Sequence, residues 1–234
     1  YENRLFLGTR AKEGENTGQY QWKTYKQVYD NARGLATSVI NKDLAPMIEE
    51  EFSIRFVGVF AKNREEYVTL FQACILYSIT LVPLYDTLGP EVVQYVLDHT
   101  KMTTIFCTSE SVEKLIQVAK EHKSAKLQNI VLLDQLTDEL KDRITHLGLN
   151  AFDYQSLVEA DKDNLIQPRL PKPDDVYYIS YTSGTTGTPK AAMISHKNMY
   201  NEVGAIMPTL PVTEEDVSLS YLPLAHIAEA TLLQ

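Results

Sequence analysis

Hydroxyl side chains, glycines and one lysine are concentrated in the stretch YTSGTTGTPKAAMISH, residues 181–196. Gly184 and Gly187 have no side chain, so the stretch can turn tightly and expose its backbone N–H groups. Inward-pointing amides form a concavity that binds anions, and Lys190 adds a positive charge. This combination predicts a site for a di- or triphosphate. The side chains that could donate to it are those of Thr182, Ser183, Thr185, Thr186, Thr188 and Lys190.

The stretch differs from a Walker phosphate loop, whose GxxxxGK[ST] sequence leads directly into a helix. Here Pro189 precedes the lysine, and the residues after Lys190 are apolar and strand-like. The alternative is an ordinary turn of a hairpin that binds nothing. Hairpin loops usually take roughly two to five residues. The segment between the two apolar runs is longer than that, which favours phosphate binding.

The elements that must position this loop follow an alternating pattern. Predicted strands recur at residues 55–60, 80–83, 103–108 and 128–134. Predicted helices begin at a capping box of Thr24 with Gln27, at a cap formed by Asn63 with Glu66, at Pro90, and at Ser111. Alternation of strands with helices predicts an α/β fold, with a largely parallel sheet flanked by helices.

A second part of the chain follows a proline-rich stretch. Three prolines in residues 168–175 predict a linker between an α/β part at 1–167 and a second one at 176–234. In the second part, strands are predicted at 176–182, 191–195 and 217–223, with helices after Ser195 and from Ala225. The last predicted helix reaches Gln234 without a cap, so we expect a truncated piece of a longer protein.

Bulk composition excludes some functions. Hydrophobic residues make up 44% of the chain and the net charge is −9, which indicates a folded core and argues against general nucleic-acid binding. Cys74 and Cys107 lie in apolar runs, as expected of buried, reduced thiols in an intracellular protein. The uncharged run 67–85 contains polar residues and Pro83, so it predicts a buried helix and strand rather than a membrane span.

Three stretches resemble signatures of the adenylate-forming superfamily of acyl-CoA synthetases, luciferases and peptide-synthetase adenylation domains. YTSGTTGTPKAAMISH resembles the phosphate-loop signature, and SYLPLAHIAE at 220–229 resembles the next signature. LVPLYDTLGPEVVQYVLDHT at 81–100 is similar to the long-chain fatty acyl-CoA synthetase branch. The resemblance implies the layered N-terminal domain of that fold, incomplete at its C-terminus.

The resemblance also implies a chemistry. A fatty acid carboxylate attacks the α-phosphorus of ATP, and the thiol of CoA then displaces AMP from the acyl-adenylate. The resemblance places His226 where the carboxylate meets the α-phosphate, and Thr182 against Mg²⁺. A helix cap or a core position is the alternative for His226. The residues it implies at the β- and γ-phosphates are Thr182, Ser183, Gly184, Thr185, Thr186, Gly187, Thr188 and Lys190.

Two residues depart from the pattern of the branch. Ala191 stands where glycine is common, and Ala228 stands where a bulky aromatic residue is common. The adenine site and the catalytic lysine of the family would lie beyond Gln234, so we expect the fragment to be inactive alone. A non-catalytic scaffold subunit and a medium-chain synthetase or adenylation domain stay open as alternatives.

Cellular location follows only from the resemblance. It implies the cytoplasmic face of the endoplasmic reticulum, a mitochondrion or a peroxisome. Attachment to that membrane through parts outside these residues, and a larger assembly, stay open.

Overall fold

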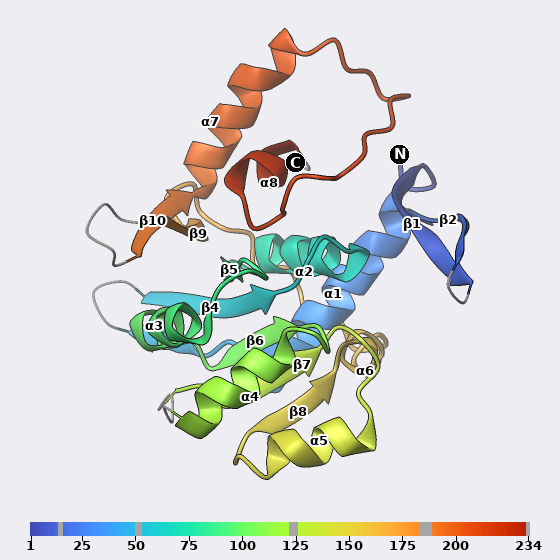
Figure 1. The fold of residues 1–234 in the computed structure, drawn as a ribbon. Helices are drawn as coiled ribbons and strands as arrows, with labels where there is room; N and C mark the ends of the chain where they lie inside the picture. The colour runs from blue at the N-terminus through green and yellow to red at the C-terminus, as the bar shows by residue number, and fades with distance from the viewer. Residues whose placement is uncertain (14–15, 50–52, 122–125, 183–188, 233–234) are drawn as a thin grey trace.

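A central sheet organises the molecule in this computed structural model, which describes residues 1–234 except 14–15, 50–52, 122–125, 183–188 and 233–234 (Figure 1). The sheet has eight strands in the order β10-β9-β5-β4-β6-β7-β8, and β3 pairs with β4. The pairs of β9 with β10 and of β3 with β4 are antiparallel, and the others are parallel. The strands are β3 (Met47–Glu49), β4 (Ser53–Phe60), β5 (Thr80–Leu84), β6 (Thr104–Cys107), β7 (Asn129–Leu132), β8 (Asn150–Asp153), β9 (Val176–Thr182) and β10 (Lys190–Ser195).

Helices cover both faces of this sheet. They are α1 (Tyr25–Asn41), α2 (Glu65–Leu76), α3 (Pro90–Thr100), α4 (Val112–Glu121), α5 (Asp138–Thr145), α6 (Tyr154–Ala160), α7 (His196–Ile206) and α8 (Ile227–Leu232), with a 3₁₀ turn η1 (Met207–Thr209). Along β4, Val57 and Val59 pack with α1, α2 and α6, whereas Phe56 and Phe60 pack with α3 and α4. Side chains alternate between the two faces and both faces are buried, which explains the continuous apolar runs. The predicted α/β fold is confirmed.

Two helix caps show how far local sequence decides structure. The capping box at α1 is confirmed: the Gln27 N–H donates to Thr24 Oγ1 over 3.2 Å, and Gln27 Oε1 accepts from the Thr24 N–H over 2.8 Å. The predicted cap of Asn63 with Glu66 is wrong. Arg64 occupies the cap position of α2 and makes no side-chain cap bond. Asn63 lies one residue earlier, and its amide binds a distant segment instead of the helix.

Several elements were not predicted. The chain begins with an antiparallel hairpin of β1 (Leu5–Glu13) and β2 (Asn16–Thr24), which forms a separate two-stranded sheet. The polar stretch after β7 contains α5, β8 and α6. Helix α6 packs on α1 so closely that a Cβ added to Gly34 would lie 2.4 Å from the Val158 carbonyl oxygen. Glycine is therefore required at that crossing.

The predicted strand at 217–223 is wrong, because this described segment contains neither helix nor strand. The strands predicted at 176–182 and 191–195 are confirmed, the second beginning one residue earlier, at Lys190. The Ser195 cap of α7 is confirmed too, and it forms a capping box with Asn198. The division of the chain at 168–175 stays a prediction. No helix within the described ranges is long and apolar enough to span a membrane.

Candidate functional site

The loop that is predicted to bind phosphate lies between β9 and β10, whose ends the structure describes. Thr182, the last residue of β9, is the antiparallel partner of Lys190, the first residue of β10, and both side chains are exposed. Directly opposed residues in such a pair have Cβ atoms about 4.5–5.5 Å apart. The Thr182 and Lys190 side chains therefore leave the backbone at neighbouring positions where the two strands meet the loop. The other predicted phosphate ligands lie at 183–188, outside the described residues: Ser183, Gly184, Thr185, Thr186, Gly187 and Thr188.

Strand β9 fixes this pair to the sheet. Tyr177, Tyr178 and Ile179 are 3%, 0% and 4% exposed. Tyr178 is the parallel partner of Leu81 in β5, and its ring meets the Phe71 ring edge-on, with centroids 6.1 Å apart. The buried half of β9 is thus part of the core, and its exposed end carries the predicted ligand.

The start of β9 is tied down by polar contacts. The Ser78 hydroxyl and the Lys172 N–H each donate to Asp175 Oδ2 over 2.9 Å, and the Thr80 hydroxyl donates to the Val176 carbonyl over 2.6 Å. Burial alone would raise the pKa of Asp175, but the bonds from the Lys172 N–H and the Ser78 hydroxyl lower it. Asp175 is therefore ionised at neutral pH and holds the strand entry in place.

His226 combines a cap with a free face. Its side chain is exposed, which excludes the core alternative, and its Nδ1 accepts from the Ala228 N–H over 3.2 Å in the first turn of α8. With Nδ1 as acceptor, the neutral imidazole carries its proton on Nε2. His226 thus caps α8 through one nitrogen and can donate a hydrogen bond to a ligand through the other.

Two residues that sequence reasoning missed hold the segment before His226. The Tyr178 hydroxyl donates to the Ala225 carbonyl over 2.6 Å. Asn63 Oδ1 accepts from the Leu224 N–H over 2.8 Å. Tyr178 appears in the sequence only as a strand residue and Asn63 only as a helix cap, so neither carried a signal for this contact.

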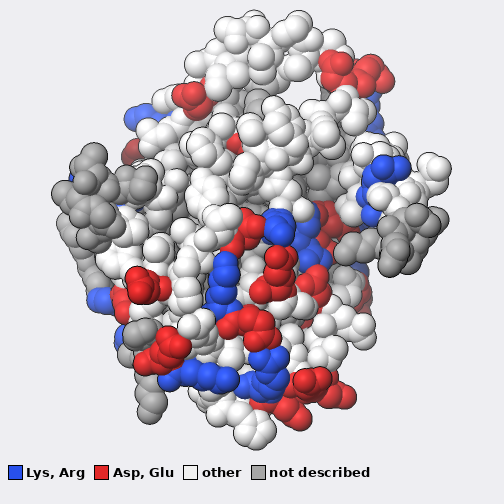
Figure 2. Space-filling view, viewed as in Figure 1, with Lys and Arg blue, Asp and Glu red and all other residues white. Residues whose placement is uncertain are grey.

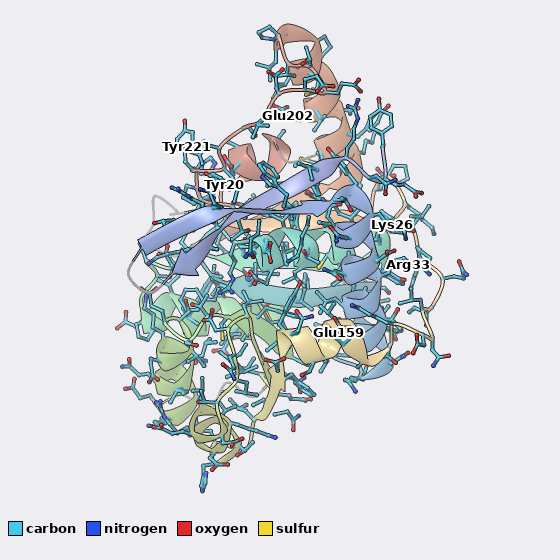
Figure 3. All side chains as sticks on the ribbon, turned by 90° about the vertical axis from the view of Figure 1, so that its right-hand side faces the viewer. Tyr20, Lys26, Arg33, Glu159, Glu202 and Tyr221 are labelled. Atoms are coloured by element: carbon cyan, nitrogen blue, oxygen red, sulfur yellow. The ribbon has the colours of Figure 1, made fainter. Side chains whose placement is uncertain are left out.

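An apolar pocket of about 410 Å³ lies between β10, α7 and α8. Its apolar lining includes Met199, Ile206 and Ala228, and Glu202, labelled in Figure 3, stands at its polar side. This volume lies in the range of small-molecule sites, roughly 300–1,000 Å³. On α8 the pocket is lined by Ile227 and Ala228, the two residues that follow His226 in the chain.

Comparison with known proteins identifies the family. The family described as AMP-binding enzyme matches residues 7–233. The chain belongs to this family. It is 36% identical over 215 residues to "Long-chain-fatty-acid--CoA ligase 5" of Rattus norvegicus, covering 90% of this chain and 31% of that protein. It is 35% identical over 224 residues to "Long chain acyl-CoA synthetase 6, peroxisomal" of Arabidopsis thaliana, covering 96% and 31%.

Solved structures support the fold of this chain. The adenylation domain of the carboxylate reductase of Mycobacterium chelonae superimposes with a TM-score of 0.81 at 19% identity, over 99% of this chain and 38% of that one. The A-PCP didomain of carboxylic acid reductase of Segniliparus rugosus, in complex with AMP, gives a TM-score of 0.78 at 19% identity, over 98% and 35%. The chain spans about a third of the length of the curated relatives it matches: 31% of the rat protein and 31% of the Arabidopsis protein named above.

The side chains that the structure describes offer few ligands for a metal ion. Within the described ranges no group of three or more His, Cys, Asp and Glu residues could hold a metal ion. Thr182 offers a single hydroxyl oxygen, so phosphate oxygens would supply most ligands of a Mg²⁺ ion there. Cys74 and Cys107 are buried and unpaired, as predicted, and burial raises the pKa of both thiols.

Proposed function

We propose that this chain supplies the phosphate-binding and carboxylate-binding part of an AMP-forming long-chain fatty acid–CoA ligase. One observation carries the proposal: strand β9 is connected both to the predicted phosphate loop and to the segment before His226. Its end, Thr182, stands beside Lys190 at the predicted phosphate loop. Its buried Tyr178 holds the backbone directly before His226. The names of the curated relatives support the substrate class.

The first half-reaction needs donors for the leaving pyrophosphate. In the proposed ligase the fatty acid carboxylate attacks the α-phosphorus of ATP, and the bond from that phosphorus to the pyrophosphate oxygen breaks. Lys190 and the hydroxyls at 182–188 bind the β- and γ-phosphates, where negative charge accumulates. Mg²⁺, when bound to the phosphates beside Thr182, supplies further neutralisation of that charge.

His226 acts at the other end of the triphosphate. Its Nε2–H donates to the carboxylate or to an α-phosphate oxygen and orients the two reactants. In the second half-reaction the CoA thiol attacks the acyl carbonyl carbon, and AMP leaves with the electrons of the acyl–oxygen bond. The apolar pocket between α7 and α8 receives part of the acyl chain, which brings the carboxylate toward His226.

A profile of acyl-CoA formation against chain length tests the substrate class. The ligase that carries this chain is incubated with ATP, CoA and fatty acids from short to long, and the thioester is quantified. The proposal predicts the highest kcat/KM for long chains. A maximum at medium chains would favour the medium-chain alternative. No thioester, together with a native mass near 26.5 kDa, would favour a non-catalytic scaffold.

A further inference from the structure

We propose that Asn63 is a positioning residue that fixes the backbone of residues 220–225 and thereby places His226. The inference rests on the proposed function for its catalytic consequence but not for its structural one. The segment from Leu210 to His226 joins η1 to α8 without any helix or strand (Figure 1). Backbone groups in such a segment need partners other than a ladder.

The segment has little side-chain burial before Leu224. Val217, Leu219 and Tyr221 are 76%, 72% and 76% exposed, and Figure 3 shows Tyr221 pointing outward. The ion pairs of this loop lie farther from His226, where Arg4 pairs with Glu214 over 3.0 Å and with Glu215 over 3.5 Å, and Figure 2 shows acidic side chains on the upper right of this face. Leu224, by contrast, is 4% exposed. Packing therefore fixes only the last residues before His226.

The Asn63 amide makes the hydrogen bonds to this segment that the backbone of a neighbouring strand would otherwise make. Its Nδ2 donates to the Leu222 carbonyl over 2.6 Å, and its Oδ1 accepts from the Leu224 N–H over 2.8 Å. In a parallel ladder one peptide residue bonds to the two residues flanking its partner in the same way. Nδ2 also lies 3.1 Å from Ser220 Oγ and 3.4 Å from the Ser220 carbonyl.

Asn63 lies just beyond the carboxyl end of β4, a strand in the middle of the sheet, and its neighbour is held by hydrogen bonds. It follows β4, and the next residue, Arg64, donates from Nη1 to Asp134 Oδ1 over 2.6 Å and from Nη2 to the Leu133 carbonyl over 3.1 Å. Asparagine is a favoured helix cap, yet α2 has no side-chain cap bond. The Asn63 amide thus bonds to residues 220–224 and not to the first N–H groups of α2.

Tyr1 and Arg4 bind Glu214 and Glu215 in the first half of this segment. Nearer His226, hydrogen bonds to other described elements come from two side chains. For residues 217–225, every such bond to another described element comes from Asn63 or from the hydroxyl of Tyr178. Tyr178 bonds to the Leu224 and Ala225 carbonyls. Loss of Asn63 leaves residues 220–223 without a side-chain hydrogen bond to another described element. The cap that His226 forms on α8 persists, so we expect the imidazole to change position but to stay at the start of α8.

Asn129 offers a matched control. It is a buried amide that also bonds through both ends: Nδ2 donates to Thr104 Oγ1 over 3.0 Å, and Oδ1 accepts from Asn150 Nδ2 over 2.9 Å. It lies in β7, in the half of the sheet away from β9. Asn63→Ala and Asn129→Ala should both lower the melting temperature, so a stability effect alone does not separate them.

Hydrogen–deuterium exchange tests the structural step on the chain itself. Asn63→Ala should increase the exchange rates of the Leu224 and His226 amides by about tenfold, because Leu224 N–H loses its acceptor on Asn63 and the turn in which His226 N–H bonds to the Pro223 carbonyl loses its support. Asn129→Ala should leave these amides unchanged. Unchanged exchange at 220–226 in Asn63→Ala overturns the inference, whatever the protein catalyses.

A double-mutant cycle tests the catalytic step in the ligase that carries this chain. Asn63→Ala should lower kcat for fatty-acid-dependent pyrophosphate exchange by about tenfold with KM for ATP nearly constant. In a His226→Ala background, the same change should have little further effect, because Asn63 acts through His226. Independent, multiplicative losses would overturn the inference. No exchange by the unaltered ligase would refute the proposed function instead, and the deuterium result would still decide the role of Asn63.

Discussion

Replacing Lys190 with alanine should slow adenylation far more than it weakens the fold. Lys190 is exposed at the first position of β10, which lies at one end of the described strand order. Loss of an exposed side chain there should cost less than about 0.5 kcal/mol of unfolding free energy. A hydrogen bond from a charged group is worth about 1.5–3 kcal/mol. Each 1.4 kcal/mol is about tenfold in rate, so adenylation should fall about 10- to 150-fold.

The assay compares two lysines in the proposed ligase that carries this chain. Pyrophosphate exchange gives the adenylation rate, and thermal unfolding gives the stability. Lys197→Ala is the matched control, because Lys197 is equally exposed but lies in α7, after β10. It should retain both the rate and the stability. An unchanged exchange rate in Lys190→Ala, or a loss fully explained by unfolding, would refute a phosphate role for Lys190.

Two further predictions concern stability. Gly34→Ala should destabilise the fold by about 1–3 kcal/mol in urea, because its Cβ would meet the Val158 carbonyl oxygen. Gly204→Ala, where a Cβ meets nothing within 4 Å, should instead stabilise by about 0.5–1 kcal/mol, and equal effects of the two would contradict this reasoning. Burial lowers the pKa of His196 below 6.5, although Asp175 opposes this. As the pH falls, the unfolded chain therefore binds a proton at His196 before the folded chain does. The unfolding free energy should decrease as the pH is lowered through about 6.5. His196→Gln should make this decrease smaller, which melting temperatures measured across this pH range would show.

Much of the fold follows from local patterns. The capping boxes at Thr24 and Ser195 involve residues three positions apart, so the sequence contains both partners. The strands β4, β5 and β9 are buried on both faces, which produces apolar runs that are visible without the structure. The same reasoning predicted strands at 176–182 and 191–195 on either side of the loop, whereas the antiparallel pairing of Thr182 with Lys190 comes from the structure.

The remaining features depend on distant partners. Residues 217–223 alternate polar and apolar side chains like a strand, but they pair with no strand among the described residues. Instead, the side chain of Asn63, which is 157–161 positions earlier in the chain, makes the hydrogen bonds to this segment. The link between Tyr178 and Ala225 spans 47 positions. Periodicity reports which side of an element is apolar and cannot report what it meets, so the anchors of the His226 segment could not be predicted.

The central claim is that this chain binds the triphosphate and the carboxylate of one adenylation reaction. Exchange of labelled pyrophosphate into ATP by the ligase that carries it, without CoA, tests the claim most directly. The account predicts exchange that requires a long-chain fatty acid and falls sharply in both Lys190→Ala and His226→Ala. Exchange with no fatty acid present, or none with any fatty acid, would contradict it.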